Sequence, residues 1–515
     1  MKVPFKRILA AAAIPLLLLT GCKNSGPVSS LQPSEDSQEE ASENTRVVLP
    51  DNFTLPYEPN QTLDPVTCPD GVQQTMGSLL YEGLFRLDET LTPQPWLCTS
   101  YQYDPATYTY TFTLRSGVLF SDGSAFTAAD AAATLRRAMN SDRYRTRLYQ
   151  VSDVSGSGST LTVVLSGPNT SFPALLDIPI VKAGTETSLT PIGTGPYQFT
   201  SGESSSRLTA NPNWWNGGAL PVQQIFLSAA EDRDTLLYQF SSHDIQLLTA
   251  DLTGTDPITA TGNTSFQDVD TTVLQYVGIN VNRAPFDNAA LRKALNLGIN
   301  RVSLISAFLS GHGSAAQFPV SPVSPLYPSE LESVYSYDAF ASAMSAAGYN
   351  TGSSSRTVKL LVNEENSFKI SIANYLAESL SVFDLKIEVE TLPWDEYIAA
   401  LSAGNFDLYY GEVKLTADWN LIRLLGTSGS LNYGRWSDTQ TDQLLAAYAS
   451  SADQAAAMKT LCAFLQEQSP ILPVCFKSNS VLYQTGVVEN LSPTMTEPFY
   501  NLSNCIIHLK SNSGT

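Results

Sequence analysis

The sequence predicts an α/β protein with at least two domains. From Thr357 onward, predicted strands and helices follow one another in strict alternation, which is typical of β-α-β units and a mostly parallel sheet. The part of the chain after residue 45 is about 470 residues long, more than one hydrophobic core ordinarily holds. The first half has more strand signals and denser turns, so we expect it to be built differently from the second half.

In the first half, residues 107–120 predict a half-buried strand because Tyr110, Phe112 and Leu114 alternate with polar residues. The segment Thr127-Ala128-Ala129-Asp130 resembles a capping box with aspartate in the place of glutamate, and it begins an alanine-rich helix that reaches about Asn140. Residues 161–165 predict another strand.

In the second half, residues 287–309 predict a helix with apolar positions at helical spacing. The alternating elements that follow are the strands Thr357–Val362, Leu385–Thr391 and Phe406–Tyr410 and the helices Ser367–Val382 and Trp394–Ser402, the second ended by Gly404.

The first 21 residues have the pattern of a secretory signal peptide. Lys2, Lys6 and Arg7 precede an uncharged apolar run, residues 8–19, which is too short to span a bilayer as a helix. Leu-Thr-Gly-Cys at residues 19–22 resembles the bacterial lipobox. We therefore expect cleavage before Cys22 and a lipid on its thiol, although an ordinary signal peptide with a chance cysteine is the alternative.

Residues 22–45 predict a flexible tether behind that cysteine. The stretch is rich in serine and acidic residues and has no aromatic residue, so it cannot bury enough surface to order itself. A coil of this length spans about 25 Å. The sequence thus predicts an exported protein, lipid-anchored to the cell membrane and facing away from the cytoplasm.

Composition and motifs exclude several classes of function. The net charge of −20 argues against a nucleic-acid partner. The motifs G-x-S-x-G and H-E-x-x-H are absent, and Gly193-Thr194-Gly195 lacks the Gly-Lys that completes a phosphate loop, so we interpret it as a tight turn. The sequence predicts neither an enzyme nor a bound cofactor or metal. The cysteines after Cys22 leave the disulfide pairing open; they are Cys68, Cys98, Cys462, Cys475 and Cys505.

Short segments over nearly the whole body resemble one family, in its order and spacing. They are Leu63-Asp64-Pro65, Tyr81-Glu82-Gly83-Leu84, Pro95-Trp96-Leu97, residues 108–123, Thr127-Ala128-Ala129-Asp130, Gly193-Thr194-Gly195-Pro196-Tyr197, Asn211-Pro212-Asn213-Trp214-Trp215, Pro285-Phe286-Asp287 and Leu291-Arg292-Lys293-Ala294-Leu295. The chain is identified on these segments as a member of the extracellular solute-binding proteins of family 5, which serve peptide ABC importers. Asn300-Arg301 departs from the family's usual Asp-Arg.

The resemblance implies a two-lobed periplasmic-binding-protein-like fold of type II (cluster C) that closes on its ligand. It implies a discontinuous first lobe (residues 46–89, 186–272 and 483–512), an extra domain inserted in it (residues 90–185) and an α/β second lobe (residues 273–482). It also implies a peptide ligand, ABC permease subunits as partners, and a monomer.

The resemblance places the ligand's ammonium group at Asp418. An Ala-Asp-Tyr segment in oligopeptide binders supplies the aspartate that pairs with the peptide's α-ammonium, and here Thr416, Asp418 and Trp419 occupy that region. A carboxylate in a closed cleft meets such a cation with a charge-assisted hydrogen bond. The position beyond a strand's carboxyl end fits independently. The alternative is an aspartate that caps the helix starting near Asn420.

Further candidates are less specific. Asp70 and Gly71 lie in a loop that matches the ligand-facing loop of the first lobe, where the main chain could pair with a peptide; a plain surface loop is the alternative. Asn432 supplies an amide group near the predicted cleft and is a further candidate for ligand binding. We expect Trp394 to be a core residue and Lys414 and Arg423 to be solvated, although either cation could meet a peptide carboxylate.

Other functions remain open at this point. The same fold could bind a non-peptide solute such as a nickel chelate, a sugar or an opine. The chain could also be a receptor that passes a signal peptide to a sensor. A secreted hydrolase is disfavoured because no catalytic constellation is present.

Overall fold

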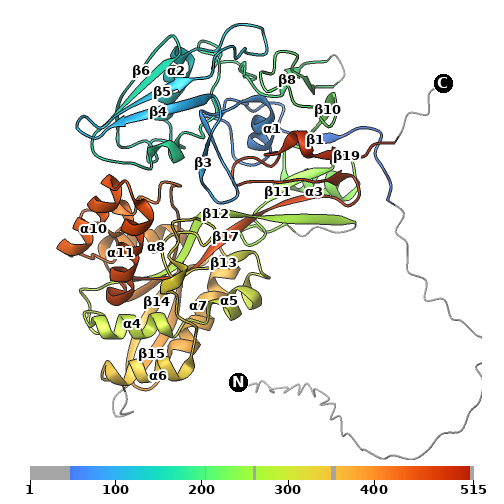
Figure 1. The fold of residues 1–515 in the computed structure, drawn as a ribbon. Coiled ribbons are helices and arrows are strands. Elements are labelled where there is room, and N and C mark those ends of the chain that lie inside the picture. The colour runs from blue at the N-terminus through green and yellow to red at the C-terminus, as the bar shows by residue number, and fades with distance from the viewer. Residues whose placement is uncertain (1–46, 203–204, 259–262, 350–354, 511–515) are drawn as a thin grey trace, which may run out of the picture. The chain divides into compact units, whose positions relative to one another are not determined.

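In the computed structural model, which describes residues 47–202, 205–258, 263–349 and 355–510, three sheets of four or more strands organise the chain (Figure 1). The first sheet has the order β1-β10-β9-β8 and packs with helix α1 over a core that includes Phe53, Leu55 and Met76. We call this region the first lobe. Its elements are β1 (Thr54–Tyr57), α1 (Val72–Leu80), β8 (Tyr197–Thr200), β9 (Arg207–Ala210) and β10 (Gln224–Ala229).

The second sheet, with the order β4-β5-β7-β6, is antiparallel, and helix α2 packs against it. We call it the inserted region. Its elements are β4 (Cys98–Asp104), β5 (Thr109–Leu114), α2 (Ala128–Ala138), β6 (Val151–Ser157) and β7 (Thr160–Leu165). The strand predicted over residues 107–120 is present but shorter, because Tyr108 has a positive φ of 53° and the chain turns after Leu114.

The predicted capping box at the start of α2 is confirmed. The Asp130 carboxylate accepts a hydrogen bond from the backbone N–H of Thr127 at 3.0 Å, and the two residues satisfy each other's free helix-end groups.

The predicted β-α-β units of the second half are also confirmed. Strand β14 pairs in parallel with both β15 and β16, and Gly404 ends α8 in the left-handed conformation that favours glycine. We call this region the second lobe. These elements are β14 (Arg356–Asn363), α7 (Ser367–Leu380), β15 (Leu385–Leu392), α8 (Trp394–Ala403) and β16 (Leu408–Lys414).

The third sheet as a whole is not mostly parallel, which corrects that prediction. Its strands β11, β12, β13 and β17 pair only in antiparallel fashion, and β12 runs antiparallel to β16. Their bounds are β11 (Leu247–Ala250), β12 (Thr264–Ile279), β13 (Gly313–Ala315) and β17 (Ile471–Gln484). No local sequence pattern predicts this antiparallel pairing, because β12 and β17 are far apart in the sequence.

The long strands β12 and β17 connect the two lobes (Figure 1). At one end β17 pairs with β11 beside the first lobe, and at the other β12 pairs with β16 of the second lobe. Buried Lys477 on β17 binds Asp251, after β11, at 2.5 Å and lies 3.6 Å from Glu412 on β16. The two strands therefore connect the lobes, and one lysine contacts acids on both sides.

The single helix predicted over residues 287–309 is two helices, α4 (Ala289–Leu297) and α5 (Arg301–Phe308). Gly298 ends the first, and a Cβ there would lie 2.6 Å from the Leu380 side chain. Asn300 begins the second by accepting a hydrogen bond from the Ser303 backbone. Asparagine is a preferred cap, so the break follows from local chemistry.

Gly193 and Thr194 are not in a turn, and the chain bends only at Gly195 and Pro196, so the predicted tight turn is absent. A Cβ at Gly193 would lie 2.0 Å from the carbonyl oxygen of Leu80, and the backbone N–H of Gly195 donates to that same oxygen. The glycines thus permit close packing on the end of α1.

The remaining elements surround these sheets. They are β2 (Phe85–Leu87), β3 (Pro93–Pro95), α3 (Arg233–Ser241), α6 (Tyr337–Ala346), α9 (Ile422–Leu425), α10 (Thr439–Ser450), α11 (Gln454–Gln468), β18 (Val488–Glu489), β19 (Ile506–Ile507) and the short helices at 172–175, 329–331 and 502–504. The cysteines Cys68, Cys98, Cys462, Cys475 and Cys505 are all free and buried. Within the described ranges, no helix has the length and hydropathy needed to cross a membrane.

Candidate functional site

Asp418 lies in the turn that follows β16, where the second lobe meets the inserted region. Its side chain is buried, with 2% of the residue exposed. The turn is closed by a hydrogen bond from the backbone N–H of Trp419 to the carbonyl of Thr416, and Trp419 has a positive φ of 51°. The structure therefore brings Thr416, Asp418 and Trp419 together in one tight turn.

The Asp418 carboxylate has partners from two regions of the chain. Its Oδ1 accepts hydrogen bonds from Thr416 Oγ1 at 2.5 Å and from the backbone N–H of Asn420 at 3.3 Å. Its Oδ2 accepts one from Asn169 Nδ2 of the inserted region at 2.8 Å. A carboxylate has about four lone-pair positions, so one on Oδ2 is left for another donor. The Asn420 bond closes a local turn and does not cap a helix, because α9 begins at Ile422, whose backbone N–H donates to Asn420 Oδ1.

Burial raises the pKa of Asp418, because a charged carboxylate loses its hydration there. The hydrogen bonds from Thr416, Asn169 and Asn420 and the charge of Arg147 oppose this shift. A buried carboxylate held in this way discriminates between a charged partner and a neutral one.

Arg147 is a cation whose charge acts on this carboxylate, and its side chain is half-buried, with 19% of it exposed. It forms an ion pair with buried Asp177, and burial lowers the pKa of its guanidinium. Its Nε has no hydrogen-bond partner among the described residues. Arg147 therefore keeps a buried donor available beside Asp418.

The loop that carries Asn169 also binds the helices of the second lobe. The backbone N–H of Thr170 donates to the carbonyl of Ala449 at 3.0 Å, and its hydroxyl donates to that of Ser451 at 2.8 Å. Gln454 Nε2 donates to the Thr170 hydroxyl at 2.9 Å. This loop thus ties the inserted region to α10 and α11.

Trp419 packs inward. It is 1% exposed and its ring contacts Phe476 edge-on, with the ring centroids 5.8 Å apart. In this structure its ring belongs to the core of the second lobe, while its backbone shapes the turn that presents Asp418.

Asp70 and Gly71 lie on the loop before α1, and Gly71, with φ of 91°, is the cap of that helix. The Asp70 side chain is 89% exposed and pairs with Arg143 at 2.9 Å. Lys414, at the end of β16, has Arg147, Asp70 and Arg143 as charged neighbours. The structure therefore brings this loop to the same cluster of charges as the segment after β16.

Lys414 is the cation of this cluster without an acid at ion-pair distance in the part of the chain that the structure describes. Desolvation, together with the like charges of Arg147 and Arg143, lowers the pKa of its ammonium group. An incoming carboxylate would relieve that repulsion.

Asn432 is committed to its own loop. Its amide donates to the carbonyls of Gly426 and Trp436 and accepts from the backbone N–H of Trp436. Trp394, which we expected in the core, is 51% exposed because it begins α8 on the solvent side.

Sequence reasoning missed Asn169, Arg147 and Asp177. They lie in loops without hydrophobic periodicity, and only the fold brings them to Asp418, so no local signal could have identified them. Cys22 lies outside the described residues. Among the described residues, no group of three or more histidine, cysteine, aspartate or glutamate side chains is placed to hold a metal ion.

Residues 92–422 match the family model described as bacterial extracellular solute-binding proteins, family 5 Middle. The chain is 25% identical over 435 residues to a glutathione-binding protein of Salmonella typhi, covering 79% of this chain and 83% of that protein. A glutathione-binding protein of Pectobacterium atrosepticum is 27% identical over 430 residues, covering 76% and 82%.

Solved structures show the same fold. A nickel ABC transporter structure from Bacillus halodurans has a TM-score of 0.74 at 19% identity, covering 88% of this chain and 99% of that one. A periplasmic murein tripeptide-binding protein in its unliganded open form also has a TM-score of 0.74, at 18% identity, covering 90% and 98%. The likeness confirms the predicted two-lobed type II fold.

Proposed function

We propose, from the premise that this chain belongs to the bacterial extracellular solute-binding proteins of family 5, that it captures peptides between its lobes and delivers them to the permease of an ABC importer. The family consists of transport binding proteins, not enzymes. Glutathione-binding relatives and a murein-tripeptide-binding neighbour make a short peptide the first ligand to test.

The observation that carries the proposal is the state of the Asp418 carboxylate. It is buried where two regions of the chain meet, it is held by neutral donors, and one lone-pair position on Oδ2 is unused. An α-ammonium group could fill that position or replace the amide of Asn169. The exchange would place a cation against the carboxylate in place of a neutral donor, which favours a ligand with a free amine.

The cations near Asp418 support a ligand that also carries a carboxylate. Arg147 has an unused buried donor, and Lys414 has like-charged neighbours. A peptide offers an ammonium group and a carboxylate on one molecule, so opposite charges of the ligand would meet opposite charges of the protein. Asp70 and Gly71 would line the first-lobe side, with Thr416 holding Asp418 and Trp419 and Asn432 supporting the second-lobe side.

Capture would proceed by hinge closure about β12 and β17. The lobes we infer are residues 46–89, 186–272 and 483–512 for the first, 90–185 for the insertion and 273–482 for the second. Lipid on Cys22 would hold the protein at the outer face of the cell membrane, within reach of the permease. Mass spectrometry of the membrane-extracted N-terminal peptide tests this anchor by the presence or absence of a diacylglyceryl group.

Native mass spectrometry of protein purified without refolding tests the ligand class, because a retained peptide has an identifiable mass and fragments. A retained metal chelate, or a retained non-peptide ligand whose binding is lost in Asp418→Asn, would instead overturn the peptide proposal.

Titration calorimetry with the identified peptide then tests Asp418. We expect Asp418→Asn to weaken binding about 10- to 100-fold, the loss of one charge-assisted bond. Asp395→Asn, at an exposed acid of α8, is the matched control and should bind normally. Equal binding by both variants would remove Asp418 from the site.

A further inference from the structure

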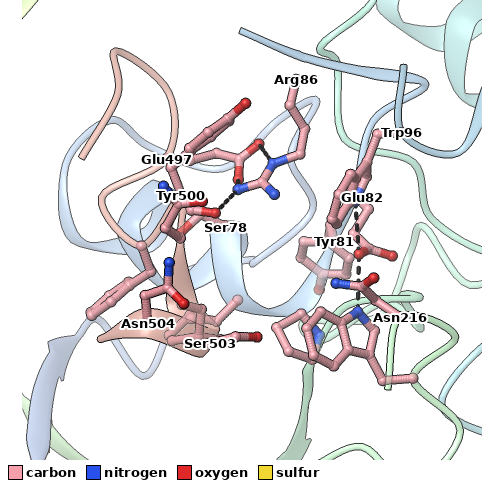
Figure 2. A pocket seen from close by; sticks show the side chains of 16 residues that line it. Ser78, Tyr81, Glu82, Arg86, Trp96, Asn216, Glu497, Tyr500, Ser503 and Asn504 are labelled. Carbon is pink, nitrogen blue, oxygen red and sulfur yellow. Dashed lines mark hydrogen bonds and ion pairs between the residues drawn. The ribbon is translucent and has the colours of Figure 1, made fainter. Parts of the chain in front are cut away.

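The first lobe contains a cavity of about 300 Å³ that is separate from Asp418 (Figure 2). The end of α1, the segment around Trp214 and the C-terminal segment 497–504 enclose it. None of its lining residues is a hydrogen-bond partner of Asp418. The volume is at the lower end of the range for small-molecule sites, so it suits one small ring or its equivalent.

The acid in the cavity wall, Glu82, has no acceptor capacity to spare. Its Oε1 accepts hydrogen bonds from the indole N–H groups of Trp96 at 2.9 Å and Trp214 at 3.1 Å. Its Oε2 accepts one from the indole of Trp215 at 2.9 Å and one from the Thr194 hydroxyl at 2.7 Å. These four bonds fill the carboxylate and fix the orientation of the indoles.

The cation in the wall, Arg86, is also compensated. Its Nε donates to Glu497 at 2.8 Å and its Nη2 lies 2.5 Å from the other oxygen of that carboxylate, as Figure 2 shows. The guanidinium also lies over the rings of Trp96 and Tyr500, at 4.4 and 4.1 Å from their centroids. The cavity therefore presents no uncompensated charge to a ligand.

Trp214 is a half-buried aromatic residue of the cavity wall, whereas Tyr81, which also lines the cavity, is 3% exposed. Trp96 and Tyr500 are covered by Arg86, and Phe499 packs on Phe53. In the described part of the chain, no aromatic ring or guanidinium is stacked on Trp214, although its indole is fixed by Glu82. A fixed, half-buried indole in the cavity wall offers apolar surface that costs little conformational entropy on binding.

Three asparagine side chains line the same cavity as Trp214. Asn216, Asn501 and Asn504 all line the cavity and are exposed, and none of their side chains has a hydrogen-bond partner among the described residues. Each amide offers both donors and an acceptor. Amide groups of this kind form hydrogen bonds with adjacent hydroxyl groups on a ligand, because each hydroxyl can both donate and accept.

We propose that this cavity is a second binding site, for a neutral saccharide. A sugar ring has an apolar C–H face for Trp214 and hydroxyl groups for Asn216, Asn501 and Asn504, and it carries no charge that the compensated walls would have to meet. The site goes beyond the peptide function, because it lies within one lobe and does not depend on closure about the hinge.

Saturation-transfer NMR and tryptophan fluorescence of the full chain test this site with N-acetylglucosamine and glucose as probes, and with glucuronate as a charged analogue. We expect a saturable signal from at least one neutral sugar and a weaker one from glucuronate. The absence of saturable binding by both neutral sugars overturns the proposal, and so does binding of glucuronate as tight as that of glucose.

Variants separate this cavity from the cleft between the lobes. The double change Asn216→Ala and Asn504→Ala, at exposed positions, should weaken sugar binding at least about tenfold. Asn405→Ala, at an exposed asparagine of the second lobe, should not. Asp418→Asn should also leave sugar binding unchanged. Sugar binding that survives the double change, or that is lost in Asp418→Asn, overturns the assignment to this cavity.

Discussion

Glu82 in the first lobe and Asp418 in the second are both buried carboxylates, but their partners differ. Glu82 is saturated by four donors that all come from its own side of the hinge. Asp418 has three donors, one of which, Asn169, reaches it from the inserted region. The Glu82 carboxylate has no position left for a further donor. The Asp418 carboxylate has one, and a ligand could also replace Asn169 there.

Burial of an acid therefore does not by itself indicate a binding site. The tryptophans around Glu82 make it a structural centre whose loss would disturb the whole lobe. The incomplete shell of Asp418, shared between regions that a hinge can separate, is the arrangement suited to a ligand.

The most damaging test of the comparison is Glu82→Ala. It leaves three indole N–H groups and a hydroxyl without their acceptor, so we expect the free energy of unfolding to fall by about 3–5 kcal/mol. Urea unfolding followed by circular dichroism measures this. If Glu82→Ala lowers the free energy of unfolding no more than Asp418→Ala does, the proposed difference between the two acids is wrong.

Arg147→Met breaks the ion pair with buried Asp177 and leaves that acid and Asp418 without the charge of this cation. We expect a loss of about 3 kcal/mol in unfolding free energy, because an uncompensated buried charge is costly. Arg145→Met is the matched control, since Arg145 pairs only with exposed Asp142. Equal unfolding midpoints for the two variants would contradict the role given to Arg147.

The contribution of each of the two acids to the free energy of unfolding should depend on pH. Burial raises the pKa of Glu82 above its ordinary value of 4.5 and that of Asp418 above 3.8. Between each ordinary pKa and its raised value the folded state holds the extra proton, so the contribution to stability falls as pH rises through that window and stays lower above it.

The free energy of unfolding of the natural protein, minus that of Glu82→Gln, should therefore decrease from mildly acidic to neutral pH. Urea titrations across this range measure it. A difference that stays flat, or that grows with pH, would show that the four hydrogen bonds outweigh burial at Glu82.

Asn169→Ala is the gentlest test. It removes the hydrogen bond to Asp418 together with the side-chain bonds to Gln150 and from the backbone N–H of Ser171, for which we expect about 1–3 kcal/mol in unfolding free energy. If Asn169 competes with a ligand amine, peptide affinity should be unchanged or higher in the same calorimetric titration. A marked loss of affinity would instead make Asn169 a ligand contact.

The sequence predicted the parts of the fold that local chemistry decides. The Thr127–Asp130 cap, the strands flanking α7 and the glycine end of α8 all follow from neighbours in the chain. The antiparallel pairing of β12 with β17 did not, because partner choice across about 200 residues leaves no local pattern. For the same reason Asp418 was visible beside its strand, while Asn169 and Arg147 were not.

The strand β17 also makes the two lobes depend on each other for stability. It supplies partners to β11, β12 and β13 and buried residues to the cores of both lobes. Because losing this strand would open both cores at once, we expect the two lobes to unfold as one cooperative unit.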